Sequence, residues 1–256
     1  MARKERLTVV TGANSGMGRA TAELLRSRGE RVIGLDLAQA DVAADVATPV
    51  GRRGALEAIA ALAPDGLDAV IACAGVAIPD GPKVIAVNYF GTVALVSGLW
   101  PLLQAGRDPR AVVISSSASI YEVDPALVSL CLAGDEAGAC ARAEDNPNAY
   151  ASSKRATSRW IRRTAITPGW ADRGVLLNGI APGVVRTPMT EGMFGTEEGR
   201  HRLHESTPRA TASYAAPTDV APLLAFLASP ENRYMVGQIP FCDGGTDVLL
   251  RGEDIF

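Results

Sequence analysis

The sequence has few of the features that mark membrane-spanning, secreted or nucleic-acid-binding proteins. No apolar run reaches the roughly 18 residues that a membrane-spanning helix requires. Residues 1–6 lead directly into an apolar stretch and leave no room for a signal peptide. A net charge of −3 gives nucleic acid no electrostatic reason to bind. These absences predict a cytoplasmic protein that contacts neither membranes nor nucleic acids.

Cysteine and histidine are also scarce. The four cysteines form neither a CxxC pair nor a secreted disulfide framework, which favours reduced thiols. The two histidines, His201 and His204, are three residues apart, and no third ligand stands nearby. We interpret them as part of a solvated helix face and predict no metal site.

The chain does contain enough apolar sequence for one α/β domain. Hydrophobic residues make up 47% of its 256 residues, and no linker, repeat or low-complexity tract divides it. We therefore expect a single domain spanning residues 1–256. Strand-like apolar runs occur at 7–10, 31–35, 68–75, 111–114, 175–180 and 238–242, and a long helical pattern covers 84–103. This alternation predicts a Rossmann-type, doubly wound parallel sheet, which binds ligands at the carboxyl ends of its strands.

A glycine-rich loop follows the first predicted strand. Residues 11–18 read Thr-Gly-Ala-Asn-Ser-Gly-Met-Gly, a helix that Gly29 can end comes next, and the second strand closes on Asp36. This order is typical of dinucleotide-binding units, in which the glycines let the backbone approach a pyrophosphate at the helix N-terminus. The alternative is a glycine-rich turn in an ordinary βαβ unit, which would leave the acid after the second strand unexplained.

Asp36 also bears on the choice of dinucleotide. A carboxylate at this position accepts hydrogen bonds from the ribose hydroxyls and repels a 2′-phosphate. No basic residue lies beside it in residues 35–39, and Ser15 stands where an NADP-binding loop could place a cation. The sequence therefore predicts NAD as the cofactor, in preference to NADP.

Tyr150 and Lys154 are four residues apart and would share one face of a helix. A free tyrosine titrates near 10, and bringing its pKa to neutrality requires roughly 4 kcal/mol. One cation at ~4 Å supplies this at an effective dielectric constant of about 20. We therefore expect Lys154 to lower the pKa of Tyr150, so that the phenol can exchange protons with an alcohol oxygen. The alternative is a half-buried tyrosine beside a solvated lysine.

Over essentially its whole length, the chain resembles the short-chain dehydrogenase/reductase family. The motifs that carry the resemblance are the TGxxxGxG loop, Asp36, Asp45-Val46, Ala74-Gly75, Asn88, Ser116, Tyr150-x-x-x-Lys154, Asn178, Pro182-Gly183 with Thr187, and Asp243-Gly244-Gly245. The resemblance implies that Tyr150 is the catalytic acid and base and that Lys154 holds the nicotinamide ribose. It further implies that Ser116 bonds the substrate oxygen and that Asn88 fixes a water for proton relay.

The same resemblance implies a set of cofactor-binding residues. Asp45 and Val46 would flank the adenine, and Thr187 would contact the carboxamide. The full set is Gly12, Asn14, Ser15, Gly16, Met17, Gly18, Asp36, Asp45, Val46, Ala74, Gly75, Tyr150, Lys154, Pro182, Gly183, Val185 and Thr187.

The chain departs from the family pattern in two places. Ala72-Cys73-Ala74-Gly75 stands where many members carry Asn-Asn-Ala-Gly, which alters the cofactor contact without excluding it. Ser116 and Tyr150 are 34 positions apart, farther than usual, because of an insertion at about 123–147. Its pattern predicts a short helix–turn–helix. The insertion could be a subunit contact, a wall of the substrate pocket or an inert surface elaboration. Together with Val-Asn-Tyr-Phe-Gly at 87–91, Val-Ile-Ser-Ser at 113–116 and Gly-Gly-Thr-Asp at 244–247, the insertion makes the chain resemble especially the bacterial 3α-hydroxysteroid dehydrogenase/carbonyl reductase subgroup.

Any of three consecutive serines, Ser115, Ser116 and Ser117, could be the catalytic one. Adjacent strand residues face opposite ways, so only one parity can face the nicotinamide. The family register in Ile-Ser-Ser assigns that role to Ser116 and leaves Ser115 and Ser117 to packing or capping.

Apolar residues follow the serine run and Thr187. We expect a substrate pocket formed by Ser116, Ile120, Tyr121, Met189, Met193 and Phe194. Residues 188–208 contain Gly192, Gly195 and Gly199 and could act as a mobile lid or as a closed, packed loop. The apolar side chains favour a hydrophobic substrate such as a steroid, terpenoid or aromatic alcohol.

These observations together predict reversible hydride transfer between a hydrophobic secondary alcohol and NAD, catalysed by a homo-oligomer (dimer or tetramer). A non-catalytic NAD-binding regulator on the same fold is the first alternative, although such proteins can lose the tyrosine or lysine that this chain keeps. A dehydratase or epimerase is the second. Sugar-nucleotide enzymes of that type tend to have a different glycine spacing and a longer C-terminal domain.

Overall fold

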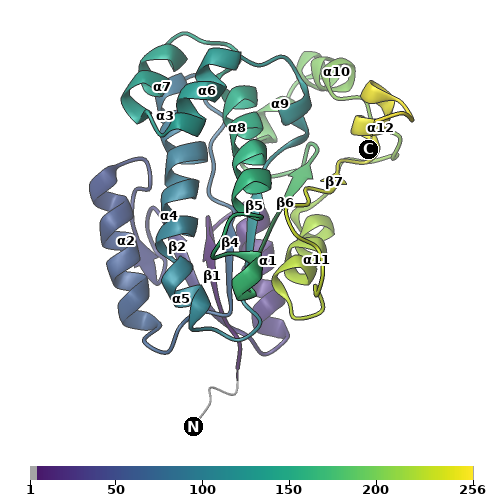
Figure 1. The fold of residues 1–256 in the computed structure, drawn as a ribbon. Helices are drawn as coiled ribbons and strands as arrows, with labels where there is room; N and C mark the ends of the chain where they lie inside the picture. Colours follow the sequence, from purple (N-terminus) through teal and green to yellow (C-terminus); the bar gives the residue numbers. More distant parts are fainter. Residues whose placement is uncertain (1–4, 256) are drawn as a thin grey trace.

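The computed structural model describes residues 5–255 and confirms the predicted α/β fold. Neighbouring strands run parallel in one seven-stranded sheet of order β3-β2-β1-β4-β5-β6-β7 (Figure 1). The strands are β1 (Leu7–Thr11), β2 (Arg31–Asp36), β3 (Val42–Ala43), β4 (Ala69–Ala72), β5 (Arg110–Ile114), β6 (Leu176–Pro182) and β7 (Phe241–Cys242). The strand order reverses between β1 and β4, which opens a crevice at the carboxyl ends of these two strands.

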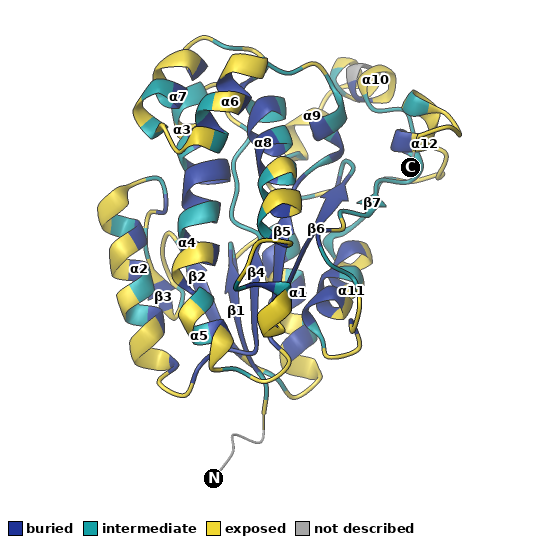
Figure 2. Ribbon diagram, in the orientation of Figure 1, coloured by how far each residue is buried: buried dark blue, intermediate teal, exposed yellow. Residues whose placement is uncertain are grey.

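Helices cover both faces of the sheet (Figure 1). On one face, α1 (Gly16–Ser27) packs against α11 (Pro217–Ala228), and Leu25 and Leu224 are buried there. The opposite face carries α2 (Pro49–Leu62), α4 (Thr92–Gly98), α5 (Trp100–Gln104) and α8 (Ala149–Thr164). Figure 2 shows buried strands between helices whose outer surfaces are exposed. Burial on both faces explains the near-continuous apolar runs of the strands.

The helical pattern expected at 84–103 forms a run of helices between Gly81 and Gln104. It begins as α3 (Gly81–Ile85), continues as a π-helical segment, η1 (Ala86–Gly91), and passes into α4 and α5. By length and composition this run could cross a membrane, but 67% of its most apolar window is buried inside the protein. Packing therefore accounts for its apolar side chains.

The insertion forms the expected helix–turn–helix, α6 (Pro125–Ala133) and α7 (Glu136–Ala143). Asp124 caps α6 by accepting hydrogen bonds from the N–H groups of Ala126 and Leu127. Gly134 ends α6 in the left-handed region at φ 79°, a conformation that glycine adopts without strain. The two helices pack on α3, η1 and α8 around a small apolar cluster of their own.

The carboxyl-terminal third differs most from the expected pattern. Residues 188–208 form two short helices, α9 (Glu191–Phe194) and α10 (Glu197–Ser206). The last predicted strand, at 238–242, shortens to β7. The Pro240 carbonyl accepts a hydrogen bond from the Ala181 N–H of β6. Pro240 itself has no N–H to donate, so it cannot continue the hydrogen-bond ladder between the two strands. The remaining short elements are η2 (Ser117–Ile120), η3 (Ala171–Arg173) and α12 (Thr246–Arg251).

Candidate active site

The glycine loop joins β1 to α1 through an unusually close backbone contact. Gly12 and Gly16 have φ values of 67° and 50°, a backbone conformation that residues with a side chain rarely adopt. A Cβ atom added to Gly18 would lie 2.1 Å from the carbonyl oxygen of Gly12, so only glycine fits there. The Thr11 hydroxyl accepts a hydrogen bond from the Ala74 N–H at 2.9 Å and so ties the loop to the end of β4.

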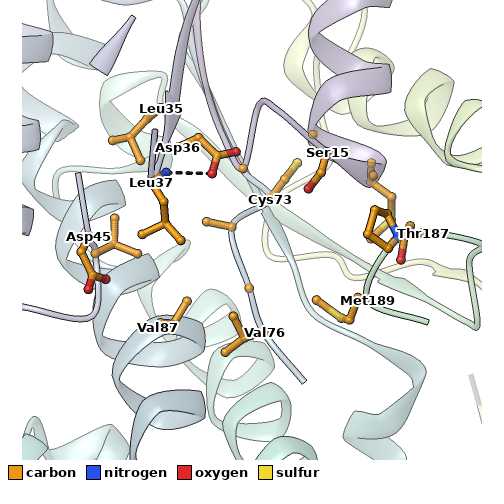
Figure 3. A pocket seen from close by; sticks show the side chains of 18 of the residues that line it. Ser15, Leu35, Asp36, Leu37, Asp45, Cys73, Val76, Val87, Thr187 and Met189 are labelled. Atoms are coloured by element: carbon orange, nitrogen blue, oxygen red, sulfur yellow. Dashed lines mark hydrogen bonds between the residues drawn. The ribbon is translucent and has the colours of Figure 1, made fainter. Parts of the chain in front are cut away.

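Asp36 stands at the end of β2, beside the glycine loop. One carboxylate oxygen accepts from the Asn14 N–H at 2.9 Å, and the other accepts from the Leu37 N–H at 2.7 Å (Figure 3). The Asn14 side chain donates to the carbonyl of Ala38 at 2.5 Å and to that of Gln39 at 3.2 Å. Asn14 therefore holds the loop against the segment after β2 and does not line the neighbouring cavity.

The crevice contains a cavity that we call the glycine-loop cavity. Asp36, Leu37 and Asp45 lie at one end of it, and Thr187 and Met189 lie at the other (Figure 3). Its lining includes, from the expected cofactor set, Gly12, Ser15, Gly16, Met17, Gly18, Asp36, Asp45, Val46, Ala74, Gly75 and Thr187. Met189, which was expected in the substrate pocket, also lines this cavity. The lining residues that were not predicted from the sequence are Leu35, Leu37, Ala44, Cys73, Val76, Lys83, Val87 and Pro188. Several of these directly follow the strands, a position that could have identified them.

Tyr150 and Lys154 lie on α8 and line a smaller adjoining space, the tyrosine cavity. The rest of the expected cofactor set, Pro182, Gly183 and Val185, also lines it. Lys154 is 4% exposed, and its ammonium donates to the Ile114 carbonyl at 3.1 Å. The Lys154 Nζ atom is 5.9 Å from the centre of the Tyr150 ring. The two side chains therefore share one helix face, as the spacing predicts.

The pKa values correct one expectation. Burial raises the pKa of the Tyr150 phenol, and a hydrogen bond with Ser116 only partly opposes this change. The net change in the Tyr150 pKa is therefore a rise, and the expected lowering by Lys154 is wrong. Burial also lowers the pKa of Lys154 to about 8, because the low-dielectric surroundings disfavour its charged form. Tyr150 is thus a neutral phenol, suited to donate a proton near pH 7.

The three serines after β5 have different surroundings. The Ser115 hydroxyl is buried and donates to the Lys154 carbonyl at 3.1 Å, while its oxygen is 2.6 Å from that of Ser158. Ser116 faces Tyr150 in the tyrosine cavity, and its hydroxyl accepts from the Ala118 N–H at 3.1 Å. Ser117 is buried and begins the 3₁₀ turn η2. Of the three, only Ser116 has the hydrogen bond to the tyrosine.

Asn88 lies in the π-helical segment η1 and is 1% exposed. Its amide accepts from the Val76 N–H at 2.8 Å and donates to the Val76 carbonyl at 2.9 Å. The Asn88 side chain therefore fixes the loop after β4, and the backbone carbonyl of Asn88 accepts from Thr157 at 3.4 Å. The amide does not reach the tyrosine cavity itself.

A third space of about 630 Å³, the methionine cavity, opens beside Tyr150 and Ser116. Of the expected substrate residues, Ser116, Tyr121, Met189 and Met193 line it, whereas Ile120 and Phe194 do not. Ser117, Ala118 and Tyr121 line the cavity from this segment, and Ile120 does not. The Phe194 ring packs against Tyr214 with ring centres 5.1 Å apart, and the Arg186 guanidinium lies 4.4 Å from its centre.

Several residues of this cavity were not expected. They come mainly from residues 188–208, which were predicted as a loop, and they include Thr190, Thr196, Gly199, Leu203, Ser206 and Thr207. Gly199, Leu203 and Ser206 recur at the spacing of one helix face, and Thr196 caps α10 by accepting from the Gly199 N–H at 3.0 Å. Described residues of the 123–147 insertion line none of the three cavities, so the insertion does not form the pocket wall.

Comparisons with known proteins agree with this geometry. Residues 6–127 match the short chain dehydrogenase family, and residues 137–247 match the family described as enoyl-(acyl carrier protein) reductase. The chain is 36% identical to 3-alpha-hydroxysteroid dehydrogenase/carbonyl reductase of Comamonas testosteroni, over 96% of this chain and 98% of that protein. It is 31% identical to cis-4-hydroxycyclohexanecarboxylate dehydrogenase of Sinomonas cyclohexanicum, over 94% of this chain and 96% of that protein.

A solved structure extends the comparison to three dimensions. The 3-alpha-hydroxysteroid dehydrogenase of Pseudomonas sp. B-0831, complexed with NADH, has a TM-score of 0.89 and 37% identity. The alignment covers 97% of this chain and all of that one. The similarity in sequence and fold spans nearly the whole molecule, which confirms the family and subgroup resemblance. The chain belongs to the short-chain dehydrogenase/reductase family of oxidoreductases.

Proposed function

We propose that this enzyme interconverts a hydrophobic, ring-containing secondary alcohol and its ketone, with NAD as the hydride carrier. The observation that carries the proposal is the way the three cavities meet. Tyr150 and Ser116 line both the tyrosine cavity and the methionine cavity. The tyrosine cavity in turn shares Gly75 and Thr187 with the glycine-loop cavity. A proton-transfer group thus lies between a space suited to a dinucleotide and a space suited to an apolar substrate.

The glycine-loop cavity fits NAD in its steric and electrostatic properties. Gly12, Gly16 and Gly18 carry no side chains, so the backbone stays accessible at the start of α1, where a pyrophosphate is stabilised. Asp36 places a carboxylate at the far end, which favours ribose hydroxyls over a 2′-phosphate. The similar Pseudomonas enzyme was solved as a complex with NADH. We therefore infer NAD specificity.

NAD supplies the hydride chemistry, and the side chains of the protein manage the proton and the position of the substrate. In ketone reduction, the Tyr150 phenol donates its proton to the oxygen as the carbonyl carbon gains hydride. In alcohol oxidation, the phenolate takes the hydroxyl proton as that carbon loses hydride. Ser116 donates a hydrogen bond to the substrate oxygen in both directions. Lys154 holds the nicotinamide ribose, and Asn88 keeps the loop after β4 in place.

The methionine cavity indicates the substrate class. Its volume of about 630 Å³ lies within the usual range for small-molecule sites, and Met189, Met193 and Leu203 give it an apolar lining. The relatives described above are named for a hydroxysteroid and for a hydroxycyclohexanecarboxylate, and both names describe a hydroxyl group on a ring. A further relative of 32% identity, covering 93% of this chain, is named coniferyl-alcohol dehydrogenase. These three names favour an alcohol that contains a ring.

Initial rates of NADH formation test the proposal. The purified enzyme is given NAD and a panel containing a 3-hydroxysteroid, a substituted cyclohexanol, an aromatic alcohol and a small charged hydroxy acid. We expect turnover with at least one of the cyclic or aromatic alcohols, and a higher kcat/KM with NAD than with NADP. Turnover only of the hydroxy acid would refute the apolar substrate. NADH binding without turnover of any member would favour the regulator alternative.

A further inference from the structure

Arg52, on α2, is a buried cation outside the proposed catalytic group. It is 7% exposed, and its guanidinium contacts three separate parts of the chain. It donates to the carbonyl oxygens of Val46 at 2.7 Å, Ala47 at 3.0 Å and Ala86 at 3.0 Å. It also forms a bidentate pair with the Glu136 carboxylate, with both distances at 2.7 Å. This planar, two-bond geometry is the strong form of an arginine–carboxylate contact.

The two sides of this pair have different relations to the cofactor site. Glu136 begins α7 in the inserted helical hairpin, 84 positions from Arg52 in the sequence. Val46 lines the glycine-loop cavity next to Asp45, at the end where Asp36 lies. Ala86 begins η1, the segment that carries Asn88. The pair therefore connects the insertion to one wall of the cavity, although the described residues of the insertion do not line it.

Close packing leaves this wall little freedom to move. A Cβ atom added to Gly91 of η1 would lie 2.8 Å from the Val46 carbonyl oxygen. A Cβ atom added to Gly51, beside Arg52, would lie 2.0 Å from the Asp45 carbonyl oxygen. The carbonyls of Val46 and Ala47 accept hydrogen bonds from Arg52, so Arg52 restrains the backbone that carries the Val46 side chain at the cavity wall. A change in the orientation of Arg52 would therefore alter the shape of this end of the cavity.

We propose that Glu136 of the insertion is a positioning residue for the adenosine half of NAD and acts through Arg52. This inference rests on the proposed function, because it takes the adenosine to lie at the Asp36–Val46 end of the cavity. The Glu136 carboxylate fixes the orientation of the guanidinium, and the guanidinium fixes the backbone of Val46 and Ala47. Without the carboxylate, the buried guanidinium would turn toward other acceptors and release these carbonyls.

The test compares Glu136→Gln with wild type in the binding of two parts of the cofactor. ADP-ribose contains the adenosine half, and reduced nicotinamide mononucleotide contains only the nicotinamide half. We expect the Kd of ADP-ribose to rise about 3- to 30-fold, the range found when network residues outside a site are changed. The Kd of the mononucleotide should stay the same. Isothermal titration calorimetry measures both constants on the full chain.

Arg142→Gln is the matched control. Arg142 pairs with Asp124 at 2.8 Å inside the same hairpin, and neither residue lines the glycine-loop cavity. Its loss should lower the melting temperature without changing the Kd of ADP-ribose. If Glu136→Gln does not fold, Glu136→Asp, which shortens the side chain by one methylene, is measured instead. It should raise the Kd of ADP-ribose and leave the Kd of the mononucleotide unchanged.

Four results would separate the possible failures. An unchanged ADP-ribose Kd in the folded Glu136 variant would overturn the inference, and so would equal losses for both ligands. An equal rise in the Kd of ADP-ribose in Arg142→Gln would also overturn it, because the hairpin would then affect binding through the overall stability of the protein. If wild type bound neither ADP-ribose nor NADH, the proposed function itself would fail.

Discussion

The two sides of Tyr150 are constructed in different ways. On the glycine-loop side, the cavity is bounded by the ends of buried parallel strands, and backbone and side-chain hydrogen bonds fix its loops, as between Thr11 and Ala74. On the methionine side, the cavity is bounded by the short helices α9 and α10, and Met189 and Met193 are 44% and 43% exposed. Strand ends deep in a sheet tolerate little change, whereas exposed side chains on short helices can vary.

This difference separates two kinds of specificity. The part that would hold NAD depends on backbone geometry, so a single added methyl group is enough to disturb it. The part that would hold the alcohol depends on side chains that few other residues constrain. We therefore expect changes on the glycine-loop side to affect stability and cofactor binding together. Changes in residues that line only the methionine cavity, such as Met193, should affect substrate selection alone.

Tyr150→Phe tests the boundary between the two sides and should have the largest effect. The ring remains and the proton-transfer group is lost, so kcat should fall about 100- to 10,000-fold in both directions. The Kd of NADH, measured by fluorescence titration, should stay within about twofold of wild type, because the change removes only one hydroxyl from a cavity lined by many residues. A variant that kept more than a tenth of wild-type kcat would remove Tyr150 from the proton transfer.

Gly18→Ala should be the most damaging change on the glycine-loop side. The added methyl group would lie 2.1 Å from the Gly12 carbonyl oxygen, so α1 would have to move. We expect a loss of about 1–3 kcal/mol of unfolding free energy, together with at least tenfold weaker NADH binding. Urea unfolding and NADH titration measure the two effects. Gly54→Ala on the exposed face of α2 is the control, since nothing lies within 4 Å of the added atom and alanine favours a helix.

How much of the site could be predicted depends on how far apart in the sequence its interacting residues lie. The glycine loop, Asp36 and the Tyr150–Lys154 pair are local patterns, and each lies where the strand and helix periodicity placed it. The positions of Phe194 and Ile120 were wrong because the rotation of a short helical turn depends on the side chains packed against it. The Arg52–Glu136 pair joins residues 84 positions apart, and no local pattern indicates it.

The pKa of Tyr150 shows a further limit. Residue spacing correctly places a cation on the same helix face, but the pKa also depends on how much water surrounds the phenol. Here burial raises the pKa, and the nearby Lys154 ammonium is bound to the Ile114 carbonyl. A sequence pattern shows which groups are neighbours without showing how deeply the folded protein encloses them.

Ser116→Ala should change the pH dependence of the reaction. Burial raises the pKa of Tyr150 and the Ser116 hydrogen bond lowers it, so removing the hydroxyl should raise the pKa further. Oxidation needs the phenolate, so its kcat/KM should rise with pH in wild type, and this rise should move to higher pH in the variant. Reduction needs the neutral phenol. Tyr150 should stay protonated near pH 7 in both wild type and variant, so the pH profile of reduction should not shift there. Loss of the substrate hydrogen bond should also lower kcat about tenfold in both directions.

Ser115→Ala is the control for this prediction. The Ser115 hydroxyl bonds the Lys154 carbonyl and Ser158, and the hydrogen bond that lowers the Tyr150 pKa comes from Ser116, so removal of the Ser115 hydroxyl should leave the pH profile in place. A matching alkaline shift in both variants would mean that the hydroxyls act by general packing. An unshifted profile in Ser116→Ala would show that the Ser116 hydrogen bond does not control the proton transfer.

Phe194→Ala should have the smallest effect and tests whether the methionine side acts independently. The ring lies between Arg186 and Tyr214, and Arg209 stacks on the other aromatic ring with its guanidinium carbon 3.7 Å from the ring centre. This stack holds α9, which carries Met193 into the methionine cavity. An aromatic contact of this kind contributes about 0.5–1.5 kcal/mol, so the KM for a cyclic ketone should rise about 2- to 10-fold.

The Kd of NADH should not change, and Phe194→Leu should restore part of the loss by keeping the apolar contact. If the NADH affinity fell together with the ketone affinity, the two sides of Tyr150 would be coupled through Arg186 and Thr187, and substrate selection could not vary separately from cofactor binding.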